Sequence, residues 1–250
     1  MAGPPAVPTA PPLAEPPAAR TAHFRFYDPE GAHGARIATL GAEAEGIYDS
    51  VSARTGLTLP EPLPVVVQTP AASSCAARGV ANSDDRGVGQ IRLFADAGTP
   101  REQLLAVFAH EVTHILHFVA VRGGVPDATL AEGFANWAIL PYWSAWQGFP
   151  SFEDAVRAYL DDGRFVPLDN PPADCTILRR DVIYNERASF VGYLIERYGR
   201  ERFLEASATG VPAPGSTLRE TADYARVYGV PFDQLIDEWL ARVRAGATFR

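Results

Sequence analysis

The sequence contains no lysine, and it has only two cysteines and one methionine among its 250 residues. The absence of lysine excludes catalysis through a lysine Schiff base or a lysine general base. Cys75 and Cys175 lie far apart, without a C-x-x-C pair, so they do not make a metal site by themselves. They form one disulfide if the protein works outside the cytoplasm, and they remain free thiols if it works inside.

Positive charge is also scarce. The 22 basic residues, all of them arginine, are outnumbered by 30 acidic residues, which gives a net charge of −8 at pH 7. We expect no nucleic-acid partner, because phosphate contacts need clustered positive charge and no basic stripe is present. The chain also lacks an uninterrupted apolar run of about 18 residues and a charged-then-apolar leader at Met1. We therefore expect neither a membrane span nor an intact signal peptide.

The first 21 residues consist mostly of proline and alanine. This composition favours an extended chain that cannot bury a core, so residues 1–21 are predicted to be a disordered linker. One explanation is a tether left after an export signal that this chain lacks, which places the protein outside the cytoplasm or in the secreted fraction. The other explanation is a disordered start. Residues 22–250 have ordinary globular composition, with 47% hydrophobic residues, and are predicted to form a single domain.

The hydrophobic pattern predicts strands first and helices afterwards. Strands are expected at 23–28, 63–68 and 89–95, with a helix at 31–55 and a loop at 71–88. Thr99 and Pro100 suit the start of a helix that continues through three histidines to about residue 118. Further helices are expected at 127–140, 151–161, 183–198, 200–206, 218–227 and 231–245. This order predicts an α+β fold, with a small sheet and the histidine helix in 22–118 and a mainly helical part in 119–250.

Three of the five histidines fall within the segment AVFAHEVTHILHF. His110 and His114 are one helical turn apart and flank Glu111, so both imidazoles face the same point, where they can bind a metal ion. Glu111 is then placed to take a proton from a water molecule. Core histidines are the alternative, but burial would then have to satisfy three polar groups. His117 lies about 10 Å further along the axis, so packing or a hydrogen bond is expected there.

A third ligand is available in the segment TLAEGFANWA, which follows a Gly-Gly loop that can turn the chain back. Two antiparallel helices would then bring Glu132 to His110 and His114. A solvated helix glutamate is the alternative, although the neighbours of Glu132 are apolar. Asn136, one turn beyond Glu132, is placed to fix the ring of a ligating histidine, with an ordinary surface asparagine as the alternative.

With these residues the sequence resembles the gluzincin metallopeptidases, which include thermolysin and the aminopeptidase N group, and most closely the bacterial peptidase MA-like proteins. The resemblance extends to an I-x-L strand in QIRLF (90–94) and to the helix YNERASFVGYLIERYG (184–199), and covers residues 21–244. It implies a zincin-like fold and one zinc ion held by His110, His114 and Glu132. It also implies that Glu111 is the general base and that Tyr184, unless it only packs, donates to the oxyanion.

The resemblance implies a zinc peptidase that acts on peptides or proteins. Thermolysin-like enzymes carry an aspartate where this chain has Asn136. The G-x-M-E-N segment that grips a free amino terminus is missing, so an endopeptidase is expected. A catalytically inactive binding module and a structural extracytoplasmic domain are the alternatives. Asp84, Asp85 and Arg86 contact substrate or form a solvated loop, and four aromatic residues line a pocket or pack at helix ends: Trp137, Tyr142, Trp143 and Trp146. The sequence leaves the oligomeric state open.

Overall fold

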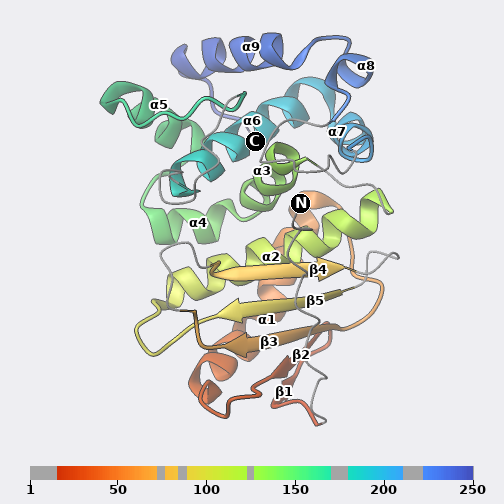
Figure 1. Cartoon of the computed structure of the whole chain (residues 1–250), viewed down its shortest axis with the longest axis vertical. Helices are drawn as coiled ribbons and strands as arrows, with labels where there is room; N and C mark the ends of the chain where they lie inside the picture. The colour runs from red at the N-terminus through yellow and green to blue at the C-terminus, as the bar shows by residue number, and fades with distance from the viewer. Residues whose placement is uncertain are drawn as a thin grey trace, which may run out of the picture.

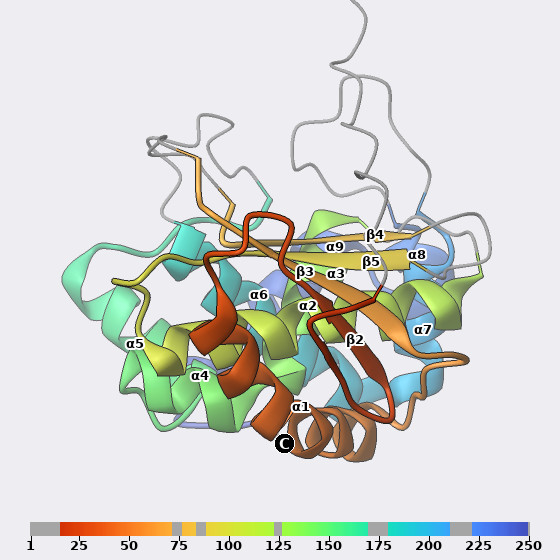
Figure 2. The same cartoon turned by 90° about the horizontal axis from the view of Figure 1, so that it is seen from below.

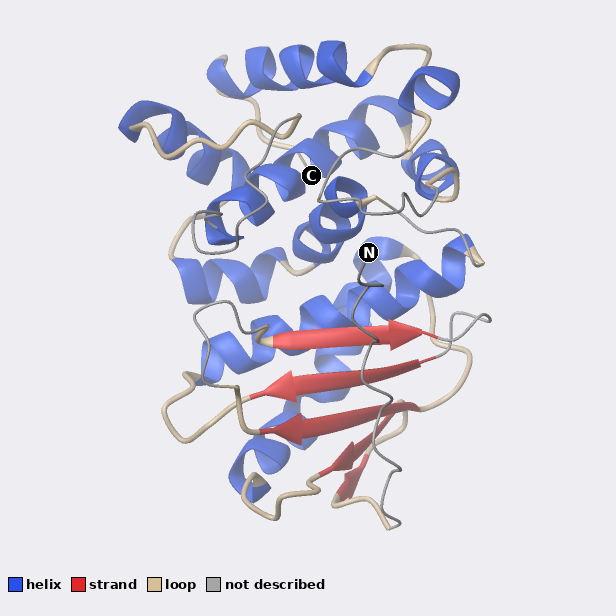
Figure 3. Ribbon diagram, viewed as in Figure 1, coloured by secondary structure: helices blue, strands red, loops and turns tan. Residues whose placement is uncertain are grey.

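A computed structural model describes residues 16–71, 77–83, 89–122, 127–169, 180–210 and 222–249. In this part of the chain, a small mixed sheet lies at one end of the molecule and a group of helices at the other (Figures 1 and 3). Helix α2 (Arg101–Val121) runs between the two, and it contacts both β4 and β5 of the sheet and helices α3 and α4. The α+β fold expected from the order of the elements is confirmed.

The sheet has five strands in the order β1-β2-β3-β5-β4. Their bounds are Ala19–Arg20, Phe24–Tyr27, Leu63–Gln68, Gly79–Ser83 and Gly89–Phe94, numbered β1 to β5 in that order of sequence. Strands β2, β3 and β5 are parallel, whereas the edge strands β1 and β4 run antiparallel to their neighbours. Val65, Val67 and Ile91 are fully buried because alternate side chains of β3 and β5 point into the core.

Helices α1 (Gly34–Thr55) and α2 pack against each other on the same face of the sheet (Figure 2). Helix α2 is long and apolar enough to cross a membrane by length and composition alone. However, 78% of its most apolar window is buried inside the structure, as is usual for a central core helix. The expectation that the chain contains no membrane span therefore stays a prediction.

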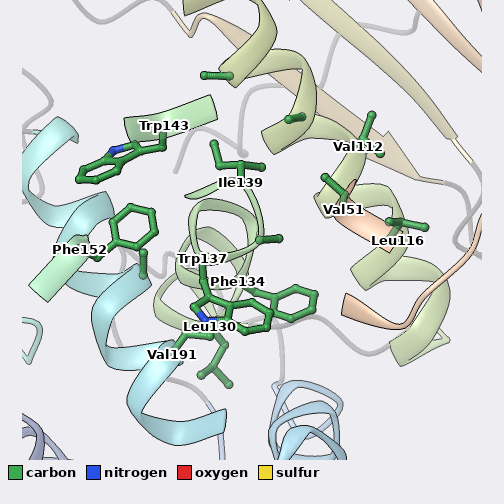
Figure 4. Packing of buried hydrophobic residues seen from close by; sticks show 14 of the residues in the cluster. Val51, Val112, Leu116, Leu130, Phe134, Trp137, Ile139, Trp143, Phe152 and Val191 are labelled. Carbon is green, nitrogen blue, oxygen red and sulfur yellow. The ribbon is translucent and has the colours of Figure 1, made fainter. Parts of the chain in front are cut away.

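The remaining helices form the second layer. Their bounds are α3 Ala128–Ala138, α4 Leu140–Gln147, α5 Phe152–Asp162, α6 Arg180–Tyr198, α7 Arg200–Ser207, α8 Tyr224–Tyr228 and α9 Phe232–Arg244. Helices α3 and α6 pack closely at Gly133, where a Cβ would lie only 2.5 Å from the carbonyl oxygen of Arg187. Figure 4 shows Phe134 and Trp137 of α3 close to Val191 of α6 in this core. Gly133 thus allows the contact that brings α6 to α3.

Several predicted boundaries were wrong. The segment predicted as a loop, 71–88, contains strand β4. Its sequence GVANS lacks apolar alternation, and the strand forms because all five residues pair with β5 in antiparallel register. The helix predicted at 127–140 ends at Ala138, and α4 was not predicted. The side chain of Thr99 does not cap α2 but bonds to Asp96, and Pro100 takes the N-cap position.

Some predictions fall wholly or partly outside the described residues. Strand β1 lies within the range predicted as a linker and pairs with β2, and residues 1–15 lie outside the described part. Cys75 and Cys175 also lie outside it, as do Asp84, Asp85 and Arg86. The disulfide and the proposed substrate contacts of this loop stay predictions.

Candidate metal centre

Two helices that are consecutive in the chain supply the candidate site. His110, Glu111 and His114 lie in the middle of α2, and Glu132 lies in α3. Asp127 caps the start of α3, because its Oδ1 accepts a hydrogen bond of 2.8 Å from the backbone N–H of Leu130. The other carboxylate oxygen of Asp127 accepts a hydrogen bond of 3.0 Å from the hydroxyl of Tyr224 on α8. These bonds fix the end of α3 that carries the glutamate.

The side chains of His110, His114 and Glu132 converge on one point. The two Nε2 atoms are 3.0 Å apart, and Oε2 of Glu132 lies 3.2 Å from Nε2 of His110 and 3.4 Å from Nε2 of His114. The histidine side chains are 11% and 10% exposed, whereas that of Glu132 is 25% exposed. The three donor atoms therefore form a compact triangle that can hold a metal ion, and Glu132 is its most exposed member.

Asn136 fixes the orientation of one ring. Its Oδ1 lies 2.7 Å from Nδ1 of His110, so this nitrogen donates a hydrogen bond to the amide oxygen. The ring of His110 then directs the lone pair of Nε2 toward the triangle, as a metal ligand requires. The hydrogen bond predicted for Asn136 is thus present, and Asn136 is buried. Nδ1 of His114 is also buried, and it has no hydrogen-bond partner among the described residues.

The carboxylate of Glu132 and the neighbouring histidines stabilise each other's charged forms. Burial alone raises the pKa of the Glu132 carboxyl, but His114 and His110 outweigh it and hold this pKa well below its ordinary range. Burial lowers the pKa of His110, and its hydrogen bond to Glu132 together with the charges of Glu111 and Glu132 reverses the shift and raises it. Glu132 is therefore a stable carboxylate in a site whose other members favour negative charge nearby.

The side chain of Glu111, which belongs to α2, lies against the edge strand β4. It is 5% exposed, and burial is the main reason why its pKa is raised, while the charges of His110 and His114 and the backbone hydrogen bond from Ala81 oppose the shift. A Cβ at Gly79 would lie 2.5 Å from Oε1 of Glu111, so this position has space only for glycine while the carboxylate stays where it is. Strand β4 thus positions Glu111 through Gly79 and Ala81, two residues that the sequence analysis did not single out.

Tyr184, near the start of α6, lies beside the triangle. Its ring is parallel to that of His110, with 6.0 Å between the ring centroids and 3° between the planes. Burial raises the pKa of Tyr184, and the charge of Glu132 raises it further. The hydroxyl therefore keeps its proton at neutral pH and remains a hydrogen-bond donor close to the site.

His117 does not take part in the triangle. Its side chain is fully buried and packs on Phe134 and Phe203, with centroid distances of 4.8 and 5.6 Å. Burial lowers the pKa of His117 to about 3, so its ring is neutral at physiological pH. The expected packing is confirmed, whereas neither ring nitrogen has a hydrogen-bond partner among the described residues.

The four aromatic residues expected to line a pocket or to pack at helix ends differ in burial. Trp137 and Trp143 are buried in the core, where Trp137 stacks on Phe134 and Trp143 packs on Phe152. Tyr142 and Trp146 are half-buried, and the guanidinium of Arg78, just before β4, lies 5.0 Å from the ring of Trp146. Packing accounts for Trp137 and Trp143.

We compared the chain with known families and with curated proteins. No family model matches it, and no curated protein gives a significant match. The geometry of the site is therefore the basis of the functional argument: a partly buried His-His-Glu group on two packed helices can bind a metal ion.

Proposed function

We propose that the protein is a zinc-dependent metallopeptidase of the gluzincin type with a zincin-like fold, closest to the peptidase MA-like group. The observation that carries this proposal is the triangle of His110, His114 and Glu132 with the buried carboxyl of Glu111 beside it. The H-E-x-x-H helix, the second helix with its glutamate and the small mixed sheet all agree with that class.

Zinc fits the donor atoms of the triangle. Tetrahedral zinc with bonds of about 2.0–2.1 Å to nitrogen and oxygen has ligand atoms roughly 3.3–3.4 Å apart. The separations of 3.0, 3.2 and 3.4 Å are close to this value. Two imidazoles and one carboxylate suit zinc better than magnesium or calcium, which prefer oxygen ligands. Structural zinc sites favour cysteine and close the coordination shell with four protein ligands, whereas this group offers three.

Glu111 is the proposed general base. When bound, zinc supplies a Lewis acid that polarises a carbonyl group and acidifies water. The carboxylate of Glu111 takes a proton from the attacking water and transfers it to the nitrogen of the leaving amine, so that one C–N bond breaks as a C–O bond forms. Burial raises the pKa of Glu111 toward the range in which a carboxylate both accepts and returns a proton efficiently.

Two further features support a peptide substrate. Tyr184 keeps its hydroxyl proton and lies against His110, so it can donate a hydrogen bond to the oxygen that becomes negative during attack. In the described part of the chain, β4 pairs only with β5, and its other edge can pair with an extended peptide. An edge strand that also holds Glu111 would place the peptide backbone beside the general base, which favours an endopeptidase.

The test combines metal analysis with cleavage of a peptide library. We expect wild-type protein to bind one zinc ion per chain and to cleave peptides. Glu111→Gln should keep the zinc ion while the cleavage rate falls about 100- to 10,000-fold. Glu102→Gln, on the exposed first turn of the same helix, is the matched control and should behave as wild type.

Each alternative gives a different result. A chain that binds no zinc contradicts the metal site itself. Zinc binding without cleavage by the wild type contradicts the peptidase and favours an inactive binding module or a structural extracytoplasmic domain. Cleavage that survives Glu111→Gln contradicts the assignment of Glu111 as the base while leaving the zinc site intact.

A further inference from the structure

Arg187 is a buried arginine on α6, one turn after Tyr184. Its side chain is 1% exposed. All three of its side-chain nitrogens are buried, and none has a hydrogen-bond partner among the described residues. The guanidinium cannot lose its proton in a protein, so burial does not neutralise it. A full charge without a partner in the interior is strongly unfavourable.

Two partly buried arginines of the protein have hydrogen-bond partners. Arg54 donates a hydrogen bond of 2.8 Å to the carbonyl of Trp137 and lies over the same ring. Arg157 donates to the carbonyls of Val243 and Ala247. In the part of the chain that the structure describes, Arg187 alone has Nε, Nη1 and Nη2 all buried and unpaired. The described residues therefore supply no partner for this guanidinium.

No carboxylate of the described residues neutralises this charge. Arg187 takes part in none of their ion pairs. Its neighbour in sequence, Glu186, is fully buried, and burial raises its pKa to about 9 although the hydrogen bond from Val166 and the charge of Arg187 act in the opposite direction. Glu186 is therefore protonated at neutral pH and carries no negative charge. The guanidinium thus keeps its unit of positive charge in this part of the core.

The backbone of Arg187 is fixed. A Cβ at Gly133 would meet the carbonyl oxygen of Arg187 at 2.5 Å and a methyl group of Val191 at 2.6 Å, so α3 and α6 are in close contact there. A small shift of α6 cannot bring the guanidinium to the surface without breaking this packing. The charge has to be matched where it is.

Arg187 is close to the metal centre. Its guanidinium carbon lies 5.9 Å from the ring centroid of Tyr184, and the same ring lies 6.0 Å from that of His110. The pKa of Tyr184 is raised mainly by burial and by the charge of Glu132, while the charge of Arg187 acts in the opposite direction. Tyr184 is half-buried and lies between the guanidinium of Arg187 and the ring of His110, so it links the two groups.

We propose that Arg187 forms an anion-binding site beside the metal centre, which takes one small anion: chloride, or the carboxylate of a bound peptide. The planar guanidinium donates two parallel hydrogen bonds to a carboxylate or a forked pair to a halide. The tight burial excludes a bulky anion. Chloride binding goes beyond the proposed peptidase activity and does not depend on it, whereas binding of a peptide carboxylate rests on that activity.

Anion binding is tested first by thermal unfolding without substrate. Chloride or acetate is titrated at constant ionic strength, with a bulky sulfonate salt as the balancing electrolyte. We expect a saturable rise of the wild-type melting temperature, about 3 °C or more at ten times the dissociation constant. Arg187→Gln should abolish the rise. It should also melt no lower than wild type at low anion concentration, because the unpaired charge is gone.

The matched control is Arg197→Gln on the same helix. Arg197 is exposed, and its guanidinium carbon lies 5.7 Å from the ring of Tyr198, a contact similar to that of Arg187 with Tyr184. This variant should keep the anion dependence of wild type. If Arg187→Gln fails to fold, Arg187→Lys and a bromide soak of wild-type crystals take its place. The anomalous signal of bromide should then lie within hydrogen-bond distance of Arg187.

The two sources of the anion are separated by the choice of probe. A rise with chloride alone indicates a free ion. A rise with acetate, together with tighter binding of a peptide acid than of the matching peptide amide to wild type only, indicates a substrate carboxylate. A wild type without anion dependence, or an equal dependence in Arg187→Gln, overturns the proposal. Because unfolding is measured without turnover, this result is independent of the Glu111→Gln test.

Discussion

Helices α2 and α6 each carry a group of buried polar side chains, and the two groups are satisfied in different ways. They are His110, Glu111 and His114 on α2, and Asn185, Glu186 and Arg187 on α6. On α2, His110 and Glu111 meet partners from other elements, with Glu132 and Asn136 of α3 on one side and Ala81 of β4 on the other, and only Nδ1 of His114 has no partner among the described residues. On α6, Asn185 donates to the hydroxyl of Tyr159, while Oε2 of Glu186 and the whole guanidinium of Arg187 have no partner among the described residues.

Two glutamates show the same contrast in the direction of their pKa shifts. Burial raises the pKa of both Glu132 and Glu186. For Glu132 the neighbouring histidines outweigh burial, so the carboxyl is ionised and can bind a cation. For Glu186, the hydrogen bond from Val166 and the charge of Arg187 do not outweigh burial, so its pKa rises to about 9 and the group stays neutral. A buried glutamate is therefore either an ionised candidate ligand or a neutral core residue, according to the charges that surround it.

Among the variants that test this contrast, Asn136→Leu should have the largest effect, because it removes the hydrogen-bond partner of His110. The substitution leaves the Nδ1–H of His110 without an acceptor and allows the ring to turn. We expect zinc affinity to fall about 10- to 100-fold, as is typical when the partner of a ligating histidine is removed. Competition with a chelating dye measures the change.

Asn185→Leu is the matched control on α6. Asn185 is buried like Asn136, but its amide donates a hydrogen bond of 2.8 Å to the hydroxyl of Tyr159, whereas Asn136 accepts one from the candidate ligand His110. This variant should lower the free energy of unfolding by about 1–3 kcal/mol and leave zinc affinity unchanged. Equal losses of zinc affinity in both variants would mean that general destabilisation, and not ring orientation, explains the first result.

Gly79→Ala tests how β4 supports Glu111. The new Cβ would lie 2.5 Å from Oε1 of Glu111 and 2.8 Å from a methyl group of Val107, so the carboxylate or the strand has to move. We expect kcat to fall at least about 10-fold with zinc content unchanged, since misplacing a general base removes part of its contribution. Gly46→Ala in α1, where a Cβ meets nothing within 4 Å, should be neutral. Full activity of Gly79→Ala would contradict the role of β4 in positioning Glu111.

The α2 side of this comparison was largely predictable from sequence. His110 and His114 are one helical turn apart, so a local rule places them together, and the apolar stripe identifies the helix. Glu132 and Asn136 required only that the next helix fold back, which a short Gly-rich connection allows. The strands β3 and β5 were predictable for a similar reason, because their apolar runs are bounded by turn residues.

The α6 side and β4 were not predictable, because they depend on contacts between distant segments. Strand β4 has a turn-like composition and exists through its pairing with β5. The role of Gly79 follows from the carboxylate that lies on it, not from its own sequence neighbours. Arg187 lies in a helix whose sequence pattern was recognised, but a charged residue there is expected at the surface unless the burial of both neighbouring helices is known.

Glu186→Gln sharpens the comparison through pH. The folded-state pKa of about 9 lies above the ordinary value of 4.5, so the neutral carboxyl stabilises the protein below that ordinary value and the contribution is lost as the pH rises toward 9. Glutamine is neutral throughout and keeps an oxygen for the backbone N–H of Val166. The stability of the variant relative to wild type should therefore increase by up to about 1.4 kcal/mol per pH unit between about pH 5 and about pH 8.

Urea unfolding at several pH values measures this difference. Glu196→Gln, exposed near the other end of α6, is the control and should follow the pH profile of wild type. A constant difference between Glu186→Gln and wild type over this range would show that Glu186 is already ionised in the folded protein. In that case Glu186 would neutralise Arg187, and the contrast between α2 and α6 would disappear.

His117→Leu should have the smallest effect at neutral pH, and it tests whether every histidine of α2 belongs to the site. His117 has two buried ring nitrogens without a partner among the described residues, and leucine has a similar volume without polar atoms. We expect a change in the free energy of unfolding within about 1 kcal/mol, in the stabilising direction, and unchanged zinc affinity. Below about pH 6 the advantage of the variant should grow, because the unfolded wild type gains a proton at His117 that the folded form, with a pKa of about 3, does not bind. A loss of zinc affinity comparable to that of Asn136→Leu would instead place His117 among the groups that hold the metal.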